Sequence, residues 1–304
     1  MVDVLIIGGG PAGLTAAVYA KRAGRSVLVL EKEAFGGQIA ESPKVENFPT
    51  IRTIDGAELT QRLLDQVVDL GVDIDIDEVV GIEKEDGIFK VHAEYGDYEA
   101  LSVIICAGCK HREIKAKGIE KFIDNGISYC AVCDGAFYEG KDICLIGDAN
   151  TALQYALLLS NICHKVYLCT LFDRFFGEQP LVDSILEKEN IEVHHNVLLD
   201  EVKGNDSIEE VVFLNKDTNN LENYQVDGLF IAIGQVPAND AFKNLVDLDE
   251  VGYIKATDDG FTKTEGLFVA GDCRTKKLRQ VATAVGDAAN AANNANLYLL
   301  SIKK

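Results

Sequence analysis

Two cysteines, Cys130 and Cys133, stand three positions apart and are followed at once by an acid, Asp134. Cysteines at this spacing can close a small disulfide ring at a helix start, where the helix dipole and nearby acids shift the balance between thiol and thiolate. An acid beside the pair can supply the proton that a leaving thiolate requires. We therefore predict a redox-active disulfide, with Asp134 as its acid.

A structural zinc site is the alternative for this pair, and it needs two further Cys or His ligands at compatible spacing. Cys106 and Cys109 offer such a pair, but the apolar run 103–108 around them is typical of a buried strand end. A C-x-x-C motif beside a strand–helix–strand pattern favours redox chemistry in a cytosolic chain. We expect no metal site and six inert cysteines.

Composition and charge narrow the class of protein. The chain has 304 residues, enough for two domains, and 47% of them are hydrophobic without any apolar run near 18 residues, so we expect no membrane span. The first residues lack an export signal, and eight cysteines without one indicate a reducing compartment, for which we predict the cytoplasm. The 49 acidic and 29 basic residues give a net charge of −20, which disfavours nucleic acid and anionic membranes as partners.

A glycine loop follows the first apolar strand, which covers residues 4–7. The loop, Gly8 to Gly13, precedes a helix over residues 14–22, and a second strand over residues 26–30 ends at Glu31. A G-x-G-x-x-G motif between strand and helix presents backbone N–H groups to a pyrophosphate, and an acid after the next strand can bind a ribose hydroxyl. This pattern predicts dinucleotide binding.

The segment that follows has the composition of a shaped loop. Gln38 and Asn47 could hydrogen-bond a heteroaromatic ring there, although ordinary polar loop residues remain the alternative. A helix over residues 56–70 shows one apolar face, and antiparallel strands follow between residues 79 and 105.

These motifs, with Gly271-Asp272 and Arg279-Gln280-Val281 near the end, closely resemble the low-molecular-weight flavin thioredoxin reductases over essentially the whole chain. The resemblance implies an α/β fold of two Rossmann-like nucleotide-binding domains, each with three-layer ββα-type architecture. The FAD-binding domain would comprise residues 1–111 and 236–304. An inserted NAD(P)-binding-like domain, residues 112–235, would carry the redox disulfide.

The same resemblance assigns roles to single residues. Cys133 would exchange electrons with the flavin, Cys130 would attack the disulfide of thioredoxin, and Asp134 would protonate the outgoing thiolate. Asp272 would meet the ribityl and phosphate part of FAD. The residues expected to bind FAD are Gly8, Gly10, Pro11, Ala12, Gly13, Glu31, Lys32, Gly37, Gln38, Asn47, Val80, Ala107, Gly108, Gly271, Asp272, Arg279, Gln280, Val281 and Ala282.

The central region repeats the first strand and glycine loop with changes. Its strand covers residues 143–146, and its loop runs from Gly147 to Ala152. Ala149 replaces the second glycine, and Asp148 adds a negative charge, so both changes oppose a phosphate-bearing ligand. The position that corresponds to Glu31 is Thr170, which offers no acid to the ribose of NADH.

Thioredoxin reductases that use NADPH carry His-Arg-Arg and a further Arg in the segment that begins here. This chain has Thr170, Leu171 and Phe172, then Phe176 in place of the later Arg, with Arg174 as the only nearby cation expected. Charge-assisted hydrogen bonds contribute about 1.5–3 kcal/mol each, so their loss predicts that NADPH is not used. The alternative is that the phenylalanines are core residues and the domain binds nucleotide by an altered route.

Without nicotinamide, the electrons need another source. The chain resembles most the ferredoxin-dependent branch of the family, which lacks both nicotinamide signatures. Electrons passing from a ferredoxin near about −400 mV to thioredoxin near about −270 mV release roughly 6 kcal/mol per pair. FAD would be the intermediary between the one-electron donor and the two-electron disulfide.

Basic residues and small residues suggest further contacts. An acidic ferredoxin could dock on Lys110, His111, Arg112, Lys115 and Lys117, or on Arg274, Lys276, Lys277 and Arg279, although such runs are often solvated faces. A last helix over residues 281–300 carries Ala282, Ala284, Ala288, Ala289 and Ala292, which suit close packing, with a homodimer interface as one candidate.

Three competing functions remain open at this point. They are an NADPH-dependent thioredoxin reductase with a degenerate loop, a related dithiol oxidase that uses oxygen, and a flavin-bound redox sensor without enzymatic activity.

Overall fold

The computed structural model describes residues 1–42, 44–123 and 125–302. The chain divides into two compact units, Met1–Lys110 with Val236–Lys304 (unit 1) and His111–Gln235 (unit 2). The sequence placed the first boundary one residue later, after residue 111. Each unit is built around its own parallel sheet.

Unit 1 is organised around the strand that follows the N-terminus. Its elements are β1 (Val2–Ile7), α1 (Pro11–Arg22), β2 (Val27–Glu31), η1 (Gly37–Glu41), α2 (Gly56–Asp69), β3 (Asp73–Ile76), β4 (Val79–Glu85), β5 (Ile88–Ala93), β6 (Asp97–Ile105), η4 (Asp240–Phe242), β17 (Leu267–Val269), η5 (Gly271–Cys273) and α6 (Val281–Ile302). Strands β3, β2, β1, β6 and β17 run parallel, while β4, β5 and the start of β6 form an antiparallel arm.

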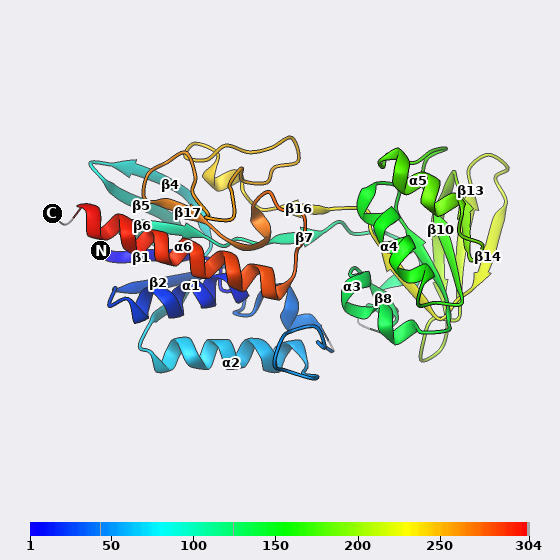
Figure 1. The fold of residues 1–304 in the computed structure, drawn as a ribbon, viewed down its shortest axis with the longest axis horizontal. Helices are drawn as coiled ribbons and strands as arrows, with labels where there is room; N and C mark the ends of the chain where they lie inside the picture. The colour runs from blue at the N-terminus through cyan, green and yellow to red at the C-terminus, as the bar shows by residue number, and fades with distance from the viewer. Residues whose placement is uncertain (43, 124, 303–304) are drawn as a thin grey trace. The chain divides into compact units, whose positions relative to one another are not determined.

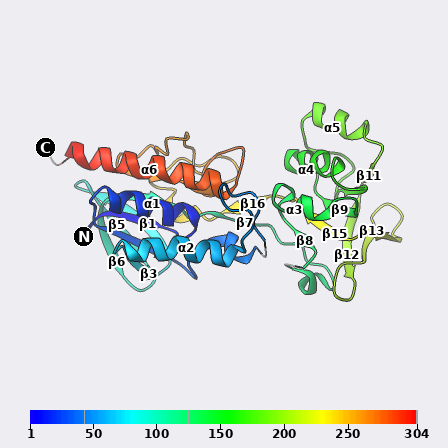
Figure 2. The same cartoon turned by 60° about the horizontal axis from the view of Figure 1, so that its bottom comes forward.

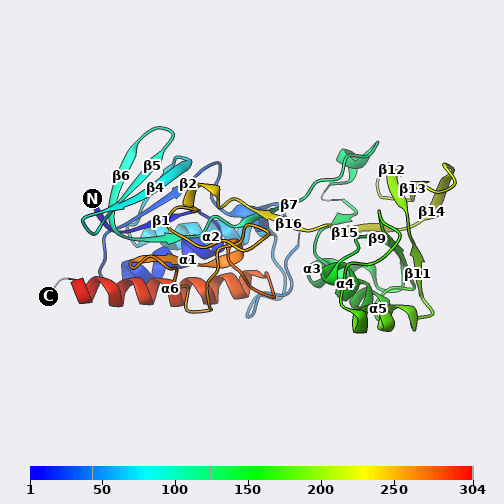
Figure 3. The ribbon, with the colours of Figure 1, turned by 90° about the horizontal axis from the view of Figure 1, so that it is seen from above.

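The parallel sheet of unit 1 is buried on both faces, which explains the uninterrupted apolar run of β1. Val4 and Ile6 pack on the side of the helices, whereas Leu5 and Ile7 pack on the side of the antiparallel arm. Alternate residues of a strand point to opposite faces, so a strand covered on both sides must be apolar throughout. Helices α1 and α6 lie on one side of this sheet and β4 and β5 on the other (Figure 3).

The alanine-rich helix α6 packs within its own unit. Figure 2 shows α6, α1 and α2 side by side, and Ala284, Ala288 and Ala292 are buried in the core that α1 and α6 share. The expectation that these alanines form a dimer interface is therefore wrong: small side chains let α6 approach α1 closely. Ala282 is exposed and Ala289 half-buried.

Unit 2 repeats this order of elements. They are η2 (Ile119–Phe122), β8 (Ile127–Ser128), α3 (Ala131–Asp134), η3 (Gly135–Tyr138), β9 (Asp142–Ile146), α4 (Asn150–Ser160), β10 (Lys165–Cys169), α5 (Gln179–Leu186), β11 (Ile191–His194), β12 (Val197–Lys203), β13 (Glu210–Asn215), β14 (Leu221–Gln225) and β15 (Gly228–Ile231). A parallel sheet has the strand order β11-β10-β9-β15-β8, and β12, β13 and β14 form an antiparallel sheet.

The layers of unit 2 match those of unit 1. One core lies between the parallel sheet and the antiparallel sheet, and a second lies between the parallel sheet and helices α4 and α5. Strand β9, helix α4 and strand β10 follow one another as β1, α1 and β2 do. Figure 1 labels α4 and β10 in unit 2 and β1, α1 and β2 in unit 1. The predicted α/β class with two Rossmann-like units is confirmed.

Two short strands carry the chain between the units. These are β7 (Cys109–His111) and β16 (Gln235–Pro237), which pair with each other in a two-stranded sheet. Among the described residues, no helix has both the length and the apolar character needed to cross a membrane.

Candidate active site

The two cysteines of the motif form a disulfide in unit 2, with Cα atoms 5.2 Å apart. Cys130 is the N-cap residue of the short helix α3, and its Sγ accepts a hydrogen bond from the backbone N–H of Cys133 at 3.1 Å. Both cysteines are partly exposed. The pair therefore lies at a helix start and is partly accessible to solvent.

The predicted acid lies directly behind the disulfide, at the end of α3. Asp134 is half-buried, and the hydroxyl of Ser128 donates a hydrogen bond to its Oδ2 at 2.6 Å. Burial raises the pKa of the Asp134 carboxyl, and the hydrogen bond from Ser128 opposes this rise in part. A carboxyl with a raised pKa is suited to carry a proton that it can release to a thiolate.

The other six cysteines are buried thiols outside any disulfide. Burial raises the pKa of Cys109 and of Cys273 to about 12, so these thiols carry very little thiolate at neutral pH. Cys106 and Cys109 belong to unit 1, next to the end of β6. In the described part of the chain, no group of three or more His, Cys, Asp or Glu side chains could hold a metal ion.

The first glycine loop joins β1 to α1 in a backbone conformation that needs glycine. Gly8 has a φ of +107°, and a side chain there would collide with the carbonyl group of Cys106. A side chain at Gly13 would collide with the carbonyl of Gly8, so this glycine permits the close contact between helix and strand. Gly10 is the N-cap of α1, no side chain caps this helix, and Pro11 occupies its first turn.

The carboxylate of Glu31 is held beside this loop. Its Oε2 accepts a hydrogen bond from the backbone N–H of Gly9 at 2.6 Å, and its Oε1 accepts one from the backbone N–H of Lys32 at 2.8 Å. These contacts fix an acceptor at the end of β2, where a dinucleotide-binding domain positions a ribose.

The loop after β2 returns to the first glycine loop. The backbone N–H of Gly36 donates to the carbonyl of Gly9 at 2.9 Å, and a Cβ on Gly37 would lie 3.2 Å from Cα of Gly10. Farther along, Nδ2 of Asn47 donates to Oε1 of Gln280 at 3.0 Å. Two amides predicted from distant segments thus meet at the start of α6.

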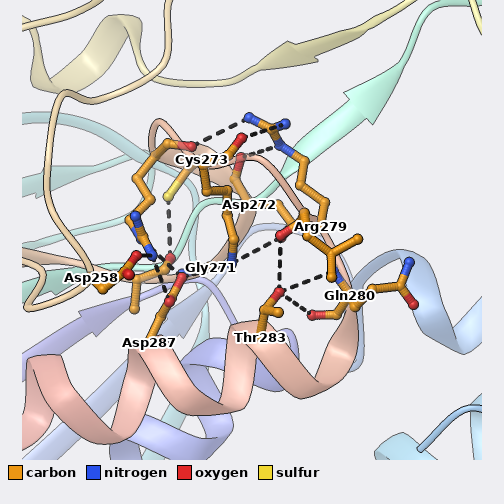
Figure 4. A network of polar contacts seen from close by, with 12 residues as sticks. Asp258, Gly271, Asp272, Cys273, Arg279, Gln280, Thr283 and Asp287 are labelled. Atoms are coloured by element: carbon orange, nitrogen blue, oxygen red, sulfur yellow. Dashed lines mark hydrogen bonds and ion pairs between the residues drawn. The ribbon is translucent and has the colours of Figure 1, made fainter. Parts of the chain in front are cut away.

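The end of β17 completes this region with a buried network of charges (Figure 4). Asp287 of α6 receives two hydrogen bonds from Arg274, one from Lys276 at 2.8 Å and one from the backbone N–H of Gly271 at 3.2 Å. Burial raises the pKa of Asp287, but the hydrogen bonds from Arg274 and Lys276 outweigh it and hold the pKa below its usual value. The network holds the backbone of Gly271 in place through its N–H. This backbone lies close to α1, since a Cβ on Gly271 would lie 2.9 Å from Cβ of Ala12.

Asp272 carries an acceptor that the protein leaves unused. Its Oδ1 is buried and accepts no hydrogen bond from the described residues, and Nζ of Lys276 lies 4.0 Å away. Burial raises the pKa of this carboxyl. An unpaired buried acceptor is costly, so the site is suited to a ligand hydroxyl.

The remaining predicted cofactor residues are arranged less tightly. Val80 lies at a β-bulge of β4 with its side chain exposed, and the β4–β5 register passes from Val79 to Gly81. Lys32 pairs with Glu33, and Gln38 is exposed. Arg279 stacks over the ring of Tyr253, with 4.1 Å between its guanidinium carbon and the ring centroid.

The second glycine loop, in unit 2, differs from the first in its surroundings. Gly147 directly follows β9, and Ala149 is the N-cap of α4. The backbone N–H of Phe176 donates to the carbonyl of Asp148 at 2.7 Å, and Nδ2 of Asn150 donates to Oε1 of Glu178 at 3.2 Å. The Glu178 carboxylate is thus bound at the first turn of α4, where the helix dipole favours an anion.

The positions of the missing arginines face solvent. Leu171, Phe172 and Phe176 are 40%, 46% and 52% exposed, so the idea that these phenylalanines belong to the core is wrong for Phe172 and Phe176. Arg174 lies over the ring of Phe176 at 5.2 Å. Arg174 is not the only nearby cation, as the sequence suggested, since Nζ of Lys216 donates to the carbonyl of Leu171 at 3.2 Å.

The two predicted basic docking patches differ in how far their side chains are exposed. In the second patch Arg274 is buried, Lys276 has a side chain only 5% exposed, and Lys277 is the exposed member. The prediction of a docking surface here is therefore wrong, because Arg274 and Lys276 neutralise the buried carboxylate of Asp287. In the first patch Arg112, Lys115 and Lys117 are exposed, and Lys117 pairs with Asp200 at 3.1 Å.

Sequence reasoning missed three polar residues of these sites. Asp287 is an acid within an alanine-rich helix, and Ser128 is a polar residue at the end of a buried strand. Each was visible as an exception to its apolar surroundings, which often marks a buried hydrogen-bond partner. Glu178 gave no such signal, because only the folded chain brings it to Asn150.

Comparisons with known proteins agree with this arrangement. Residues 2–288 match the family model for pyridine nucleotide-disulphide oxidoreductases. A 34.2 kDa protein in the rubredoxin operon of Clostridium pasteurianum is 36% identical, with 98% of this chain and 97% of that protein covered. Thioredoxin reductase from Bacillus subtilis is 36% identical, with 99% and 96% covered. The chain belongs to the thioredoxin reductase family.

The crystal structure of thioredoxin reductase from Streptococcus pyogenes shows the same fold. It superimposes with a TM-score of 0.95 at 35% identity and covers 99% of both chains. Thioredoxin reductases of this family bind FAD. Unit 1 fits this cofactor, because it offers a glycine cradle at a helix N-terminus, a fixed carboxylate at Glu31 and an unused buried acceptor at Asp272.

Replacing Asp287 by Asn should destabilise this thioredoxin reductase family member by about 3 kcal/mol, because the buried Arg274 and Lys276 lose the buried carboxylate that they share. The matched control is Asp258→Asn, which also loses a contact to Arg274 but from a side chain that is 90% exposed, so its cost should stay below about 1 kcal/mol. Urea unfolding measures both values.

The difference in unfolding free energy between wild type and Asp287→Asn should depend on pH. The folded pKa of Asp287 lies below its unfolded value, so the stability it contributes is present above the unfolded pKa and is lost as the pH falls through the folded pKa. The stability gap between wild type and Asp287→Asn should therefore close in acid. Equal stabilities of the two variants at neutral pH would contradict this role for Asp287.

Proposed function

We propose that this protein is a flavin-dependent thioredoxin reductase that takes its electrons from ferredoxin and not from a nicotinamide nucleotide. Electrons would pass to the Cys130–Cys133 disulfide and then to the disulfide of thioredoxin. The relatives named thioredoxin reductase support thioredoxin as the substrate. The observation that carries the choice of donor is the carboxylate of Glu178 at the second glycine loop.

Two carboxylates oppose a dinucleotide at this loop. Glu178 is hydrogen-bonded to Asn150 in the first turn of α4, and Asp148 lies within the loop itself. Burial raises the pKa of Asp148, which indicates that this carboxyl is partly removed from water. A pyrophosphate would meet these acids at the helix end that binds it in other dinucleotide sites, and like charges at short range repel.

The cations that could offset this repulsion are few and already engaged. Arg174 stacks on Phe176, and Lys216 binds the carbonyl of Leu171. A 2′-phosphate gains about 1.5–3 kcal/mol from each charge-assisted hydrogen bond. The loss of several such bonds, added to the two acids, supports a donor other than NADPH.

The residues of the chain then have the following roles. FAD supplies the change from one-electron to two-electron transfer, and the first glycine loop, Glu31 and Asp272 would hold it. The reduced Cys130 thiolate attacks a sulfur of the thioredoxin disulfide and forms a mixed disulfide. Asp134 protonates the outgoing thiolate, and Cys133 then attacks Cys130 to release reduced thioredoxin.

An NADPH-dependent reductase is the second candidate. It is favoured by the match to the family described as pyridine nucleotide-disulphide oxidoreductase, which includes this region of unit 2. Under this alternative, the exposed segment around Phe172 and Phe176 would have to rearrange to admit the nucleotide.

We also propose that the protein forms a homodimer through unit 1. Exposed apolar side chains gather along the second half of α6, where Leu297 and Leu300 are each 54% exposed. Beside them lies a cavity of about 320 Å³ lined by Phe261, Leu297 and Tyr298 among others. An apolar surface of this kind on a charged protein is typical of a subunit contact.

The flavin absorbance should bleach under anaerobic conditions when reduced ferredoxin is added, and subsequent addition of thioredoxin should restore it. NADPH and NADH at micromolar concentrations should leave the spectrum unchanged. A Cys133→Ser variant should bleach normally but fail to reduce thioredoxin catalytically. Bleaching of the wild type by micromolar NADPH would support the second candidate instead.

A triple variant, Leu171→Arg, Phe172→Arg and Phe176→Arg, should bind NADPH measurably in calorimetric titration. All three side chains are at least 40% exposed, so arginine fits without disturbing the core. Each new charge-assisted bond is worth about 1.5–3 kcal/mol, so NADPH should bind at least tenfold tighter than NADH, which lacks the phosphate. The control has Gln at the same three positions; equal affinity of both variants for NADPH would refute the electrostatic explanation.

Sedimentation equilibrium at micromolar concentration should give twice the chain mass of 33.1 kDa. A Leu297→Glu variant should shift the mass toward the monomer, because it places a charge in the apolar contact. Val68→Glu on α2, at a side chain 51% exposed, is the control and should remain dimeric. A monomeric wild type would refute the dimer.

A further inference from the structure

A buried serine stands immediately before the redox loop and has no part in the roles described so far. Ser128 is the last residue of β8, which pairs in parallel with β15, and its exposed fraction is 5%. A hydroxyl in this setting must find hydrogen-bond partners, because burying it without them is costly.

The hydroxyl of Ser128 has two partners, and both belong to the redox motif. It donates to Oδ2 of Asp134 at 2.6 Å, and it accepts a hydrogen bond from the backbone N–H of Cys130 at 3.1 Å. The second contact orients the hydroxyl, since its oxygen must face the Cys130 amide while its proton faces the carboxyl. One side chain therefore links the acid to the first cysteine.

The other groups around Asp134 cannot replace this contact. The Asp134 charge raises the pKa values of Tyr138 of η3 and Tyr155 of α4. Burial raises the pKa of both tyrosines, and that of Tyr138 to about 12, so both stay neutral during turnover. The hydroxyl of Tyr138 is directed to the carbonyl of Gly126 at 3.4 Å.

We propose that Ser128 is a positioning residue for disulfide exchange, which fixes Asp134 through Oδ2 and leaves Oδ1 to carry the proton for the leaving thiolate. This inference rests on the proposed function, because it assumes that Asp134 is the acid of the redox disulfide. It adds a residue that the motif does not contain and that acts through Asp134 and Cys130.

Exchange begins with the attack of the Cys130 thiolate on the substrate disulfide. The Cys130 thiolate forms a new S–S bond with one sulfur of the substrate, the substrate S–S bond breaks, and the departing sulfur leaves as a thiolate. The proton on Oδ1 of Asp134 moves to this thiolate, and the resulting carboxylate keeps its hydrogen bond from Ser128. The Cys133 sulfur then attacks Cys130 and gives up its thiol proton, and the second substrate sulfur leaves the mixed disulfide and takes up that proton. The protein disulfide is restored, so two electrons and two protons have passed to the substrate.

The test exploits the basicity of the leaving group. A dialkyl disulfide, bis(2-hydroxyethyl) disulfide, releases a basic thiolate that needs a proton, whereas the aryl disulfide 5,5′-dithiobis(2-nitrobenzoate) releases a thiolate stable without one. Protein reduced beforehand with dithiol is mixed with each disulfide in a stopped-flow instrument. Ser128→Ala should slow the reaction with the dialkyl disulfide about tenfold and leave the aryl reaction within about twofold.

The pH profile gives a second readout. The dialkyl reaction should decline as the pH rises through the pKa of Asp134, and in Ser128→Ala this decline should move to higher pH, because the hydrogen bond that opposes the rise in pKa is gone. Ser160→Ala is the matched control, since Ser160 is also buried in unit 2 but donates to the carbonyl of Leu157. It should change neither the rate ratio nor the profile.

Different results would contradict the role of Ser128 alone or the proposed function as well. Equal slowing with both disulfides, or an unchanged pH profile, would overturn the role of Ser128 while leaving the redox disulfide intact. A wild type that reduces neither disulfide would overturn the proposed function and this inference together. If Ser128→Ala folds poorly, the equally shaped pair Ser128→Thr and Ser128→Val provides the same comparison, with activity expected only where the hydroxyl remains.

Discussion

The ordering of strands in the two parallel sheets is the constraint on which both sites depend. Every crossover of a parallel sheet returns the chain to the same edge, so loops that are distant in sequence meet where the strands end. In unit 1 this edge gathers the glycine loop after β1, Cys106 after β6 and Gly271 after β17. Their backbones approach so closely that side chains at Gly8 and Gly13 cannot be accommodated. The chemistry of unit 1 follows from this crowding, since backbone groups of the glycine loop face a ligand there and the side chains of Glu31 and Asp272 add acceptors beside them.

Charge is distributed unevenly in a protein of net charge −20. Two of its cations, Arg274 and Lys276, are withdrawn from the surface to neutralise Asp287 and to secure Gly271. The surface is left correspondingly more acidic. A protein of this net charge offers an acidic partner no broad field of attraction.

The sequence was sufficient for the features that depend on local pattern. The first glycine loop, its flanking strand and helix, the disulfide and the repeat in unit 2 all follow from spacing and periodicity, although α1 starts at Pro11 and not at residue 14 as the sequence predicted. It was insufficient where burial decides the role of a residue. Arg274 and Lys276 look like a surface patch until Asp287 is placed against them, and Ala284 and Ala288 look available until α1 covers them. Ser128 and Glu178 depend on side-chain contacts that no spacing rule specifies.

The contact between Glu178 and Asn150 also determines how the second loop meets any mobile anion. The carboxylate is tethered to the loop by the chain itself, so it faces the helix end at an effective concentration that a dissolved metabolite does not reach. Relative to a free phosphate, it pays little translational entropy to stay there. The tether therefore keeps a carboxylate beside Asn150 whatever the concentration of soluble anions.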